Sequence, residues 1–125
     1  MLAGDVIQLM AQGETVSDLH VATAIRRDLS VADLRKFGDL IRDRDPEAVA
    51  VLAGIQGEKI SILAVCGKQA VSRGIKAGLV VKQVCSICGG SGGGKPDSAM
   101  GGGKDASKLN DALAGVPAFV GTKLK

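Results

Sequence analysis

Hydrophobic residues recur at helical spacing in four stretches of the chain, and one stretch carries clear start and stop signals. Ser30 is followed three residues later by Asp33, a pair that satisfies the free amide groups at the start of a helix. Asp45-Pro46 ends the same stretch. The apolar side chains between these signals fall on one face and predict a helix packed on a core: Val31, Leu34, Phe37, Leu40 and Ile41.

The other three helical stretches are shorter or less sharply bounded. The spacing predicts a short amphipathic helix over residues 1–12 and another over residues 77–88, which must end at Gly89-Gly90. A last helix begins at Asp105, a good N-terminal cap, and ends before Pro117. Its apolar side chains share one side of the helix: Leu109, Ala112, Leu113 and Val116.

Three runs have the composition of β-strands. Leu19–Ile25 is rich in β-branched residues, while Ala48–Ala53 and Lys59–Cys66 are apolar runs of strand length. The five residues between the last two runs predict a hairpin loop. We therefore expect an α/β fold: a small mixed sheet of about four to five strands with helices packed on it, preceded by a short N-terminal helix.

The length of 125 residues is enough for one hydrophobic core and too short for two. We divide the chain into an N-terminal helical segment, residues 1–18, the remnant of a longer helical region, and a globular domain, residues 19–125. Asp5 and Gln8 interrupt the first stretch, which is unlike a signal peptide, and no apolar run reaches the roughly 18 residues that a membrane helix needs. These features predict a cytoplasmic protein without a membrane partner.

The scarcity of aromatic and histidine side chains excludes several classes of function. The chain has no Trp or Tyr, and Phe37 and Phe119 are its two aromatic residues. Modules that stack single-stranded nucleic acid on aromatic side chains are therefore excluded. His20 is the single histidine, which excludes zinc sites built on several imidazoles and disfavours His-dependent hydrolases.

The charge of the chain is unevenly distributed. The net charge is +3; residues 46–125 carry ten basic and five acidic side chains, whereas residues 1–45 carry six basic and eight acidic ones. A basic bias on the glycine-rich part suits a partner that carries phosphate groups. The alternative, that these lysines only keep the surface soluble, stays open at this point.

Residues 89–103 include eight glycines, and their spacing resembles a phosphate-binding loop. Gly89 to Lys95 satisfies the glycine and lysine positions of a P-loop, but Pro96 stands where a Ser or Thr should hold magnesium. The run also follows a predicted helix rather than a strand, so we reject nucleotide hydrolysis. Two interpretations remain: a surface whose backbone amides dock an anion, or a flexible linker.

The cysteines form one CxxC motif, Cys85-Ser86-Ile87-Cys88. A structural zinc site would need two more ligands, and it would have to recruit both Cys66 and His20. We instead predict small buried thiols, no metal site and no cofactor. His20, within an apolar strand, is predicted to be structural rather than catalytic.

Five segments together carry a resemblance to a known family. They are His20-Val21-Ala22-Thr23, the pair of strands, Lys76 to Lys82, the block from Gly89 to Lys104, and Asp105 to Leu109. With these motifs the chain resembles, over about residues 20–120, the C-terminal domain of alanyl-tRNA synthetase, called C-Ala. That domain is related to the one that accompanies DHH-family phosphoesterases. The CxxC motif is similar to the eukaryotic-type branch.

The resemblance implies an accessory domain that binds the outer corner, or elbow, of alanine tRNA. In the full enzyme such a domain helps the aminoacylation and editing centres act on one tRNA, and it takes part in dimerisation. The chain has neither the ATP-binding motifs of a class II synthetase nor the histidine-rich motif of an editing domain. We therefore expect no catalysis by this chain alone, in a cytoplasmic parent enzyme or an organellar copy of it.

The predicted tRNA-binding residues lie in the basic, glycine-rich part of the chain. Backbone amides of the glycines would meet the RNA while two lysines neutralise phosphates: Gly89, Gly90, Gly92, Gly93, Gly94, Lys95 and Lys104. Second-rank candidates are Lys68, Arg73, Lys76 and Lys82. Two alternatives remain open: a dimerisation or protein-interaction module that uses residues 1–12, and a small-phosphate binder akin to the phosphoesterase relatives, in which a histidine follows the glycines where Lys95 and Pro96 stand here.

Overall fold

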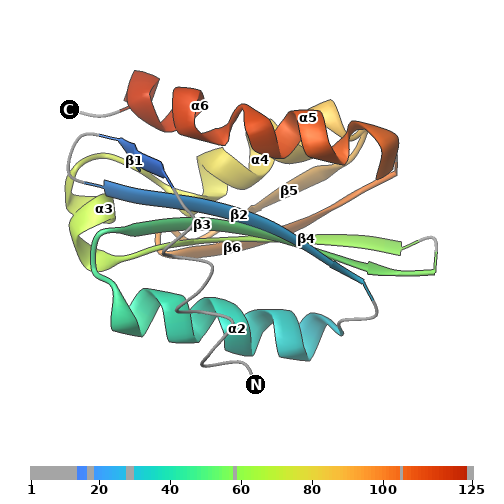
Figure 1. Ribbon diagram of the computed structural model, residues 1–125, viewed down its shortest axis with the longest axis horizontal. Coiled ribbons are helices and arrows are strands. Elements are labelled where there is room, and N and C mark those ends of the chain that lie inside the picture. The colour runs from blue at the N-terminus through green and yellow to red at the C-terminus, as the bar shows by residue number, and fades with distance from the viewer. Residues whose placement is uncertain (1–13, 17–18, 28–29, 58, 105, 124–125) are drawn as a thin grey trace.

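The structure, a computed structural model, describes residues 14–16, 19–27, 30–57, 59–104 and 106–123. Its elements follow one another in this order: β1 (Glu14–Val16), β2 (Leu19–Arg27), α2 (Val31–Arg44), β3 (Ala48–Gln56), β4 (Lys59–Cys66), α3 (Lys68–Ser72), α4 (Ala77–Ile87), β5 (Ser91–Gly94), β6 (Ser98–Gly103), the 3-10 turn η1 (Ala106–Lys108), α5 (Leu109–Ala114) and α6 (Val116–Lys123) (Figure 1).

The strands form one six-stranded mixed sheet in the order β1-β2-β3-β4-β6-β5. β2 and β3 are parallel, joined by helix α2, and the other neighbouring strands are antiparallel. The mixed α/β fold is confirmed. The sheet is larger than the predicted four to five strands because β1, β5 and β6 extend it at its two edges.

Helices cover the two faces of the sheet unequally. Helix α2 lies on one face, and α4, α5 and α6 lie on the other (Figure 1). On the α2 side, Leu34, Phe37 and Ile41 are buried against alanine, leucine and valine side chains of β2, β3 and β4. The opposite core is larger and joins β2, β3 and β4 to α3, α4, α5 and α6. Residues 48–54 of β3 are buried throughout, because both faces of this strand are covered.

Local signals account for the best predicted elements. The Oγ of Ser30 accepts a hydrogen bond from the Asp33 amide at 3.1 Å, which confirms the cap of α2. Helix α4 ends as predicted, with Gly89 in a left-handed conformation at φ 75°. Among the described residues, the structure has no helix long and apolar enough to cross a membrane.

Three local predictions were wrong, and one helix was missed. The five-residue hairpin loop is too long, since β3 and β4 pair as far as Gln56↔Lys59. Pro117 does not end the last helical region, because it lies in the first turn of α6, where the missing N–H of proline is tolerated. Residues 14–16, placed in the helical segment 1–18, instead form β1 by pairing with β2. The helix expected over residues 1–12 lies outside the described residues, and helix α3 was not predicted.

Gly67 allows a close backbone approach that holds one end of the sheet together, and Gly67→Ala tests it. A Cβ at Gly67 would lie 2.4 Å from the carbonyl oxygen of Pro46. We expect this substitution to lower the free energy of unfolding by about 1–3 kcal/mol, measured by urea denaturation. In the control, Gly121→Ala, the new Cβ meets an ordinary contact at 3.7 Å from Val16, and stability should not fall. Equal losses in the two variants would contradict the prediction.

Candidate functional site

The glycine-rich run, residues 89–103, forms the outer hairpin of the sheet. β5 pairs antiparallel with β6 in a register that places Gly93 opposite Met100. β6 pairs in turn with β4, so β5 is an edge strand, with no further strand beside it in the part of the chain that the structure describes. The run is therefore not a linker. It is not a P-loop either, because it follows helix α4 and builds an edge of the sheet.

The two strands of this hairpin, and helix α4 beside them, lie so close together that several of the glycines cannot carry a side chain. A Cβ at Gly92 would lie 2.7 Å from the Cα of Gly101, and a Cβ at Gly103 would lie 2.8 Å from the Cβ of Cys88. Gly93 differs, since a Cβ there would have no heavy atom within 4 Å. Close packing therefore explains most of these glycines. Among those of β5, only Gly93 leaves open space for a partner.

The turn of residues 95–97, which joins β5 to β6, is anchored to three other elements. The carbonyl oxygen of Pro96 accepts a hydrogen bond from the Ala77 amide at 2.8 Å, and that of Asp97 accepts one from the Cys66 amide at 3.0 Å. The Asp97 carboxylate pairs with the Arg42 guanidinium at 3.4 Å. The turn is thus fixed to the start of α4, the end of β4 and the last turns of α2.

Two hollows flank this turn, and basic side chains line both. The α4 hollow is lined by Lys76, Gly78, Leu79, Lys82, Gly93, Gly94 and Pro96. The α2 hollow, on the other side of the turn, is lined by Arg35, Asp39, Arg42, Gly93, Gly94, Lys95 and residues 97–100. The structure therefore brings three of the predicted lysines to one place: Lys76, Lys82 and Lys95.

The remaining predicted cations lie farther from the turn or on another side of it. Lys68 lines a third depression, the α3 hollow, together with Arg42, Asp43, Pro46, Cys66, Val71, Pro96 and Asp97. Arg73 follows α3 and lines none of these three hollows. Lys104 lies beside Gly89, where its amide donates to the Cys88 carbonyl oxygen at 2.9 Å. The six residues of β6 separate it from Lys95 by roughly 20 Å.

Two arginines at the turn were missed by the sequence analysis. Arg35 and Arg42 project from α2; the Nε of Arg35 donates to the Met100 sulfur at 3.1 Å. Arg42 is paired with Asp39 and Asp43 as well as Asp97, at 3.3 and 3.7 Å. Their seven-residue spacing places both on one face of the helix. The β5–β6 hairpin lies beside this face of α2 because β6 pairs with β4.

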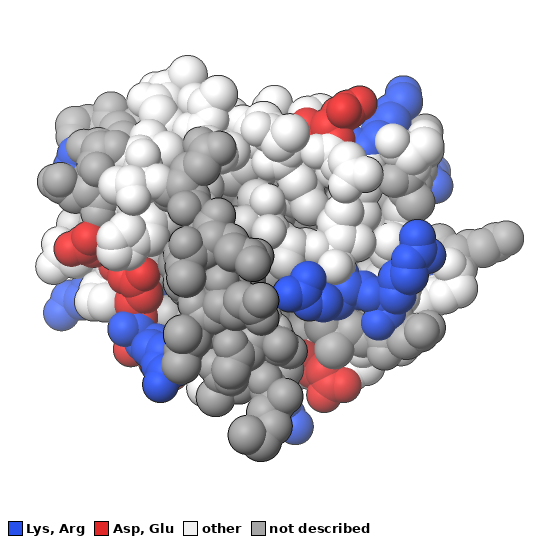
Figure 2. All heavy atoms as spheres, viewed as in Figure 1, with Lys and Arg blue, Asp and Glu red and all other residues white. Residues whose placement is uncertain are grey.

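Figure 2 shows how the charged side chains are distributed over one face of the molecule. Blue Lys and Arg spheres form one connected group in the right half of this view, and adjoining red and blue groups lie at the left (Figure 2). The gathering of cations around residues 95–97 follows from the hollows that meet at the β5 edge. Basic residues therefore surround a defined feature of the fold at this edge.

The cysteines are buried thiols, as predicted, and raised pKa values make Cys66 and Cys85 poor nucleophiles. Cys66, Cys85 and Cys88 are free and buried. Burial, with a smaller contribution from the nearby Asp97 carboxylate, raises the pKa of the Cys66 thiol to about 12. Burial, followed by the neighbouring Cys88, also raises the pKa of Cys85. Within the described ranges, no three His, Cys, Asp or Glu side chains are grouped as metal ligands.

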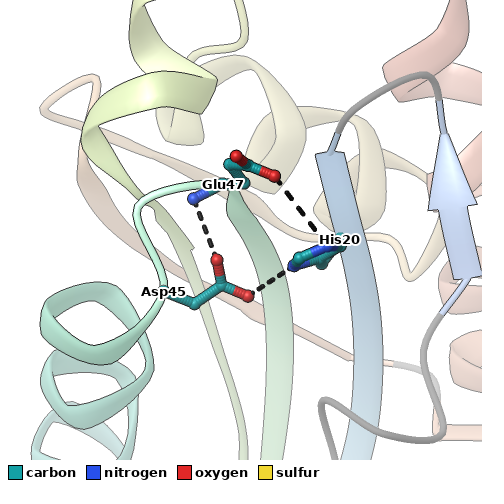
Figure 3. Close-up of polar contacts among 3 residues, drawn as sticks. All are labelled: His20, Asp45 and Glu47. Carbon is teal, nitrogen blue, oxygen red and sulfur yellow. Dashed lines mark hydrogen bonds and ion pairs between the residues drawn. The ribbon is translucent and has the colours of Figure 1, made fainter.

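His20 forms a small polar cluster with two carboxylates at the start of β2 and β3 (Figure 3). Its Nδ1 lies 2.7 Å from the Oδ2 of Asp45, and its Nε2 lies 3.9 Å from the Oε2 of Glu47. The hydrogen bond to Asp45 raises the pKa of His20 above its usual 6.5; partial burial opposes the rise, and the two negative charges support it. These contacts tie the end of α2 to the sheet, which fits a structural role.

The hairpin glycines supply a matched test of the packing argument. We expect Gly92→Ala to lower the free energy of unfolding by about 1–3 kcal/mol because of its clash with Gly101. Gly93→Ala fits the available space, so its stability should stay within about 0.5 kcal/mol of the parent chain. Thermal or urea unfolding of the two variants measures the difference. If Gly93→Ala were destabilised and Gly92→Ala were not, our conclusion that Gly92 is packed and Gly93 is open would be wrong.

The His20 cluster predicts a dependence of stability on pH. Because the folded-state pKa is raised, the stabilisation is complete below about pH 6.5, the ordinary histidine value, and is lost as the pH rises through the folded-state pKa. We expect His20→Gln to lower stability by less than about 1 kcal/mol at acid pH, since the side chain is half exposed, and by less still in alkaline buffer. Urea denaturation across this pH range gives the difference. A difference that grows with pH would contradict the assignment.

Comparisons with known proteins agree on one family. The model of the DHHA1 domain family matches residues 18–122. The alanine–tRNA ligase of Alkaliphilus oremlandii is 36% identical over 110 residues, and that of Bacillus thuringiensis is 40% identical over 106 residues. These matches cover 88% and 85% of this chain but 12% of each relative.

Solved structures give the same result. The C-Ala domain from Aquifex aeolicus alanyl-tRNA synthetase aligns with a TM-score of 0.81 and 26% identity, over 88% of this chain and 98% of that one. RecJ from Thermus thermophilus aligns over 97% of this chain and 17% of its own, with a TM-score of 0.56 and 12% identity, which shows a shared fold alone. The resemblance indicated by the sequence motifs is confirmed.

Proposed function

Since the chain belongs to the DHHA1 domain family, we propose that it is the tRNA-binding accessory domain of an alanine–tRNA ligase, equivalent to C-Ala. The observation that carries this proposal is the likeness to the solved C-Ala domain over nearly the whole length of that domain. The ligase relatives support the same parent enzyme. The remaining domains of that synthetase and a second copy of the chain are the proposed protein partners.

The β5 edge has the features expected of a surface for folded RNA. Lys76 and Lys82 lie on one side of the turn of residues 95–97, Lys95 is exposed on it, and Arg35 lines the other side. Arg42 also lines that side, where it is paired with Asp39, Asp43 and Asp97. Cations in this arrangement neutralise phosphates on both sides of a ridge of backbone that has few side chains. Such a surface recognises the shape of the sugar-phosphate backbone, as suits the outer corner of a tRNA.

In this role the domain contributes binding and no chemistry. It holds the tRNA elbow while the catalytic centres of the parent synthetase act on the acceptor end, so that aminoacylation and editing use one bound tRNA. The buried thiols of Cys66 and Cys85, with their raised pKa values, and the His20 cluster serve the fold. Anchoring of the turn to α2, β4 and α4 reduces the conformational entropy lost when RNA binds.

Removal of two cations near the turn tests this interface. We expect the double variant Lys76→Ala, Lys95→Ala to bind an alanine tRNA transcript more weakly, with a slope of log affinity against log salt that is shallower by about 1.5. Filter binding at several salt concentrations measures affinity and slope together. The thermal transition should be unchanged, because both side chains are exposed.

The matched control removes two exposed lysines from other elements, with the same change in net charge. Lys59 begins β4, near the tip of its hairpin with β3, and Lys108 ends η1. The variant Lys59→Ala, Lys108→Ala should keep most of the affinity and nearly the same slope. A transcript with a disrupted elbow should bind the parent chain more weakly than the intact transcript does. Equal effects of the two double variants would place the RNA on a different surface.

A further inference from the structure

The α3 hollow is larger than the α4 and α2 hollows, and the proposed RNA contacts do not account for it. Its volume is about 650 Å³, within the roughly 300–1,000 Å³ typical of sites for small molecules. Residues from the end of α2, the link to β3, the junction of β4 with α3, and the turn of residues 95–97 surround it. Four separate segments of the chain therefore build one concave site.

Backbone hydrogen bonds hold the walls of this hollow in place. The Pro46 carbonyl oxygen accepts from the amide of Gln69 at 2.7 Å, and the Cys66 amide donates to Asp97 at 3.0 Å. Gly67 lies between these contacts, where any Cβ would collide with the Pro46 carbonyl oxygen. The link after α2, the start of α3 and the turn are thus bonded to one another, so the hollow is preformed.

The chemistry of the lining combines apolar walls with a balanced set of charges. Pro46, Val71 and Pro96 supply aliphatic surface, while two cations, Arg42 and Lys68, and two carboxylates, Asp43 and Asp97, also line the hollow. The carboxylates would repel an isolated phosphate. A planar heterocycle with apolar faces and hydrogen-bonding edges matches this combination. Amino groups on such a ring would donate to the carboxylates, as the cytosine amino group does to Asp or Glu.

We propose that the α3 hollow binds one unpaired nucleobase of the RNA that docks at the β5 edge, with a preference for a base that carries an amino group. This inference rests on the proposed function. Arg42 and Asp97 line both the α3 hollow and the α2 hollow, and Pro96 lines both the α3 and α4 hollows. The base site is therefore continuous with the cationic surface around Lys95.

The neighbouring charges specify how the nucleotide lies. Its phosphate lies on the Lys95 side of the Arg42–Asp97 pair, and its base enters the hollow between the two prolines and Val71. The chain places neither of its two phenylalanines in this lining, so the base is held by van der Waals contact with its faces and hydrogen bonds at its edge. Lys68 is available to the next phosphate along the strand.

Methyl NMR on the unaltered chain is the first test. With Val71 methyl groups labelled, we expect the alanine tRNA transcript to shift their signals upfield through the ring current of the bound base. Ribose 5-phosphate at the same concentration should not reproduce the shift. An identical response to ribose 5-phosphate would overturn the base site in favour of a simple anion site. If free adenosine monophosphate shifted the Val71 signals as much as the tRNA does, the hollow would be a site for free nucleotides and not for a base of the bound RNA.

A substitution that fills the hollow without changing charge is the second test. We expect Val71→Phe to weaken tRNA binding about tenfold, with the salt slope unchanged because the phosphate contacts remain. The control, Leu40→Phe, enlarges an exposed apolar side chain on α2 that lines none of the three hollows, and its affinity should match that of the parent chain. If Val71→Phe does not fold, the NMR result alone decides.

The two tests separate failure of this inference from failure of the proposed function. Unshifted Val71 methyl signals and normal affinity of Val71→Phe, together with weak binding by Lys76→Ala, Lys95→Ala, would overturn the base site and leave the RNA interface in place. Absence of tRNA binding by the parent chain would overturn both. Shifted signals with weakened Val71→Phe and an unchanged salt slope would establish the site.

Discussion

Close packing of helix α4 against the glycine hairpin is the constraint on which the functional edge depends. The sulfur of Cys85 would lie 3.3 Å from a Cβ at Gly92, and the backbone oxygen of Gly94 would lie 3.1 Å from a Cβ at Gly78. Only small residues allow a helix and a strand to approach this closely. The same approach brings Lys76 and Lys82, on α4, to the lining that Gly93 and Gly94 complete.

The hairpin also connects the two sides of the sheet. The turn of residues 95–97 is bonded to α4 through Pro96 and to α2 through Asp97. Cations from helices on opposite faces therefore meet at one ridge, although the sheet separates those helices elsewhere. The three hollows share residues of this ridge, so phosphate contacts and a base site can belong to one continuous surface.

The sequence predicted those elements whose side chains alternate or repeat clearly. Ser30 and Asp33 defined the start of α2, and the apolar runs gave β2, β3 and β4. β5 and β6 could not be read in this way, because glycine has low β-propensity and offers no side chain to alternate between the faces. Lys76, Lys82 and Lys95 were named from their charge and from the motifs that contain them. Arg35 and Arg42 depend on which strand lies beside α2, a property of topology that local patterns do not contain.

The glycine composition of β5 has a consequence for the behaviour of the protein at high concentration. An exposed edge strand is a template for pairing with strands of other molecules, and such pairing leads to aggregation. β5 has only four residues, three of them glycine, and exposed Lys95 follows it directly. A short strand with little β-propensity and a charge at its end is a poor template. The residues that let α4 approach the sheet thereby also help to keep its open edge soluble.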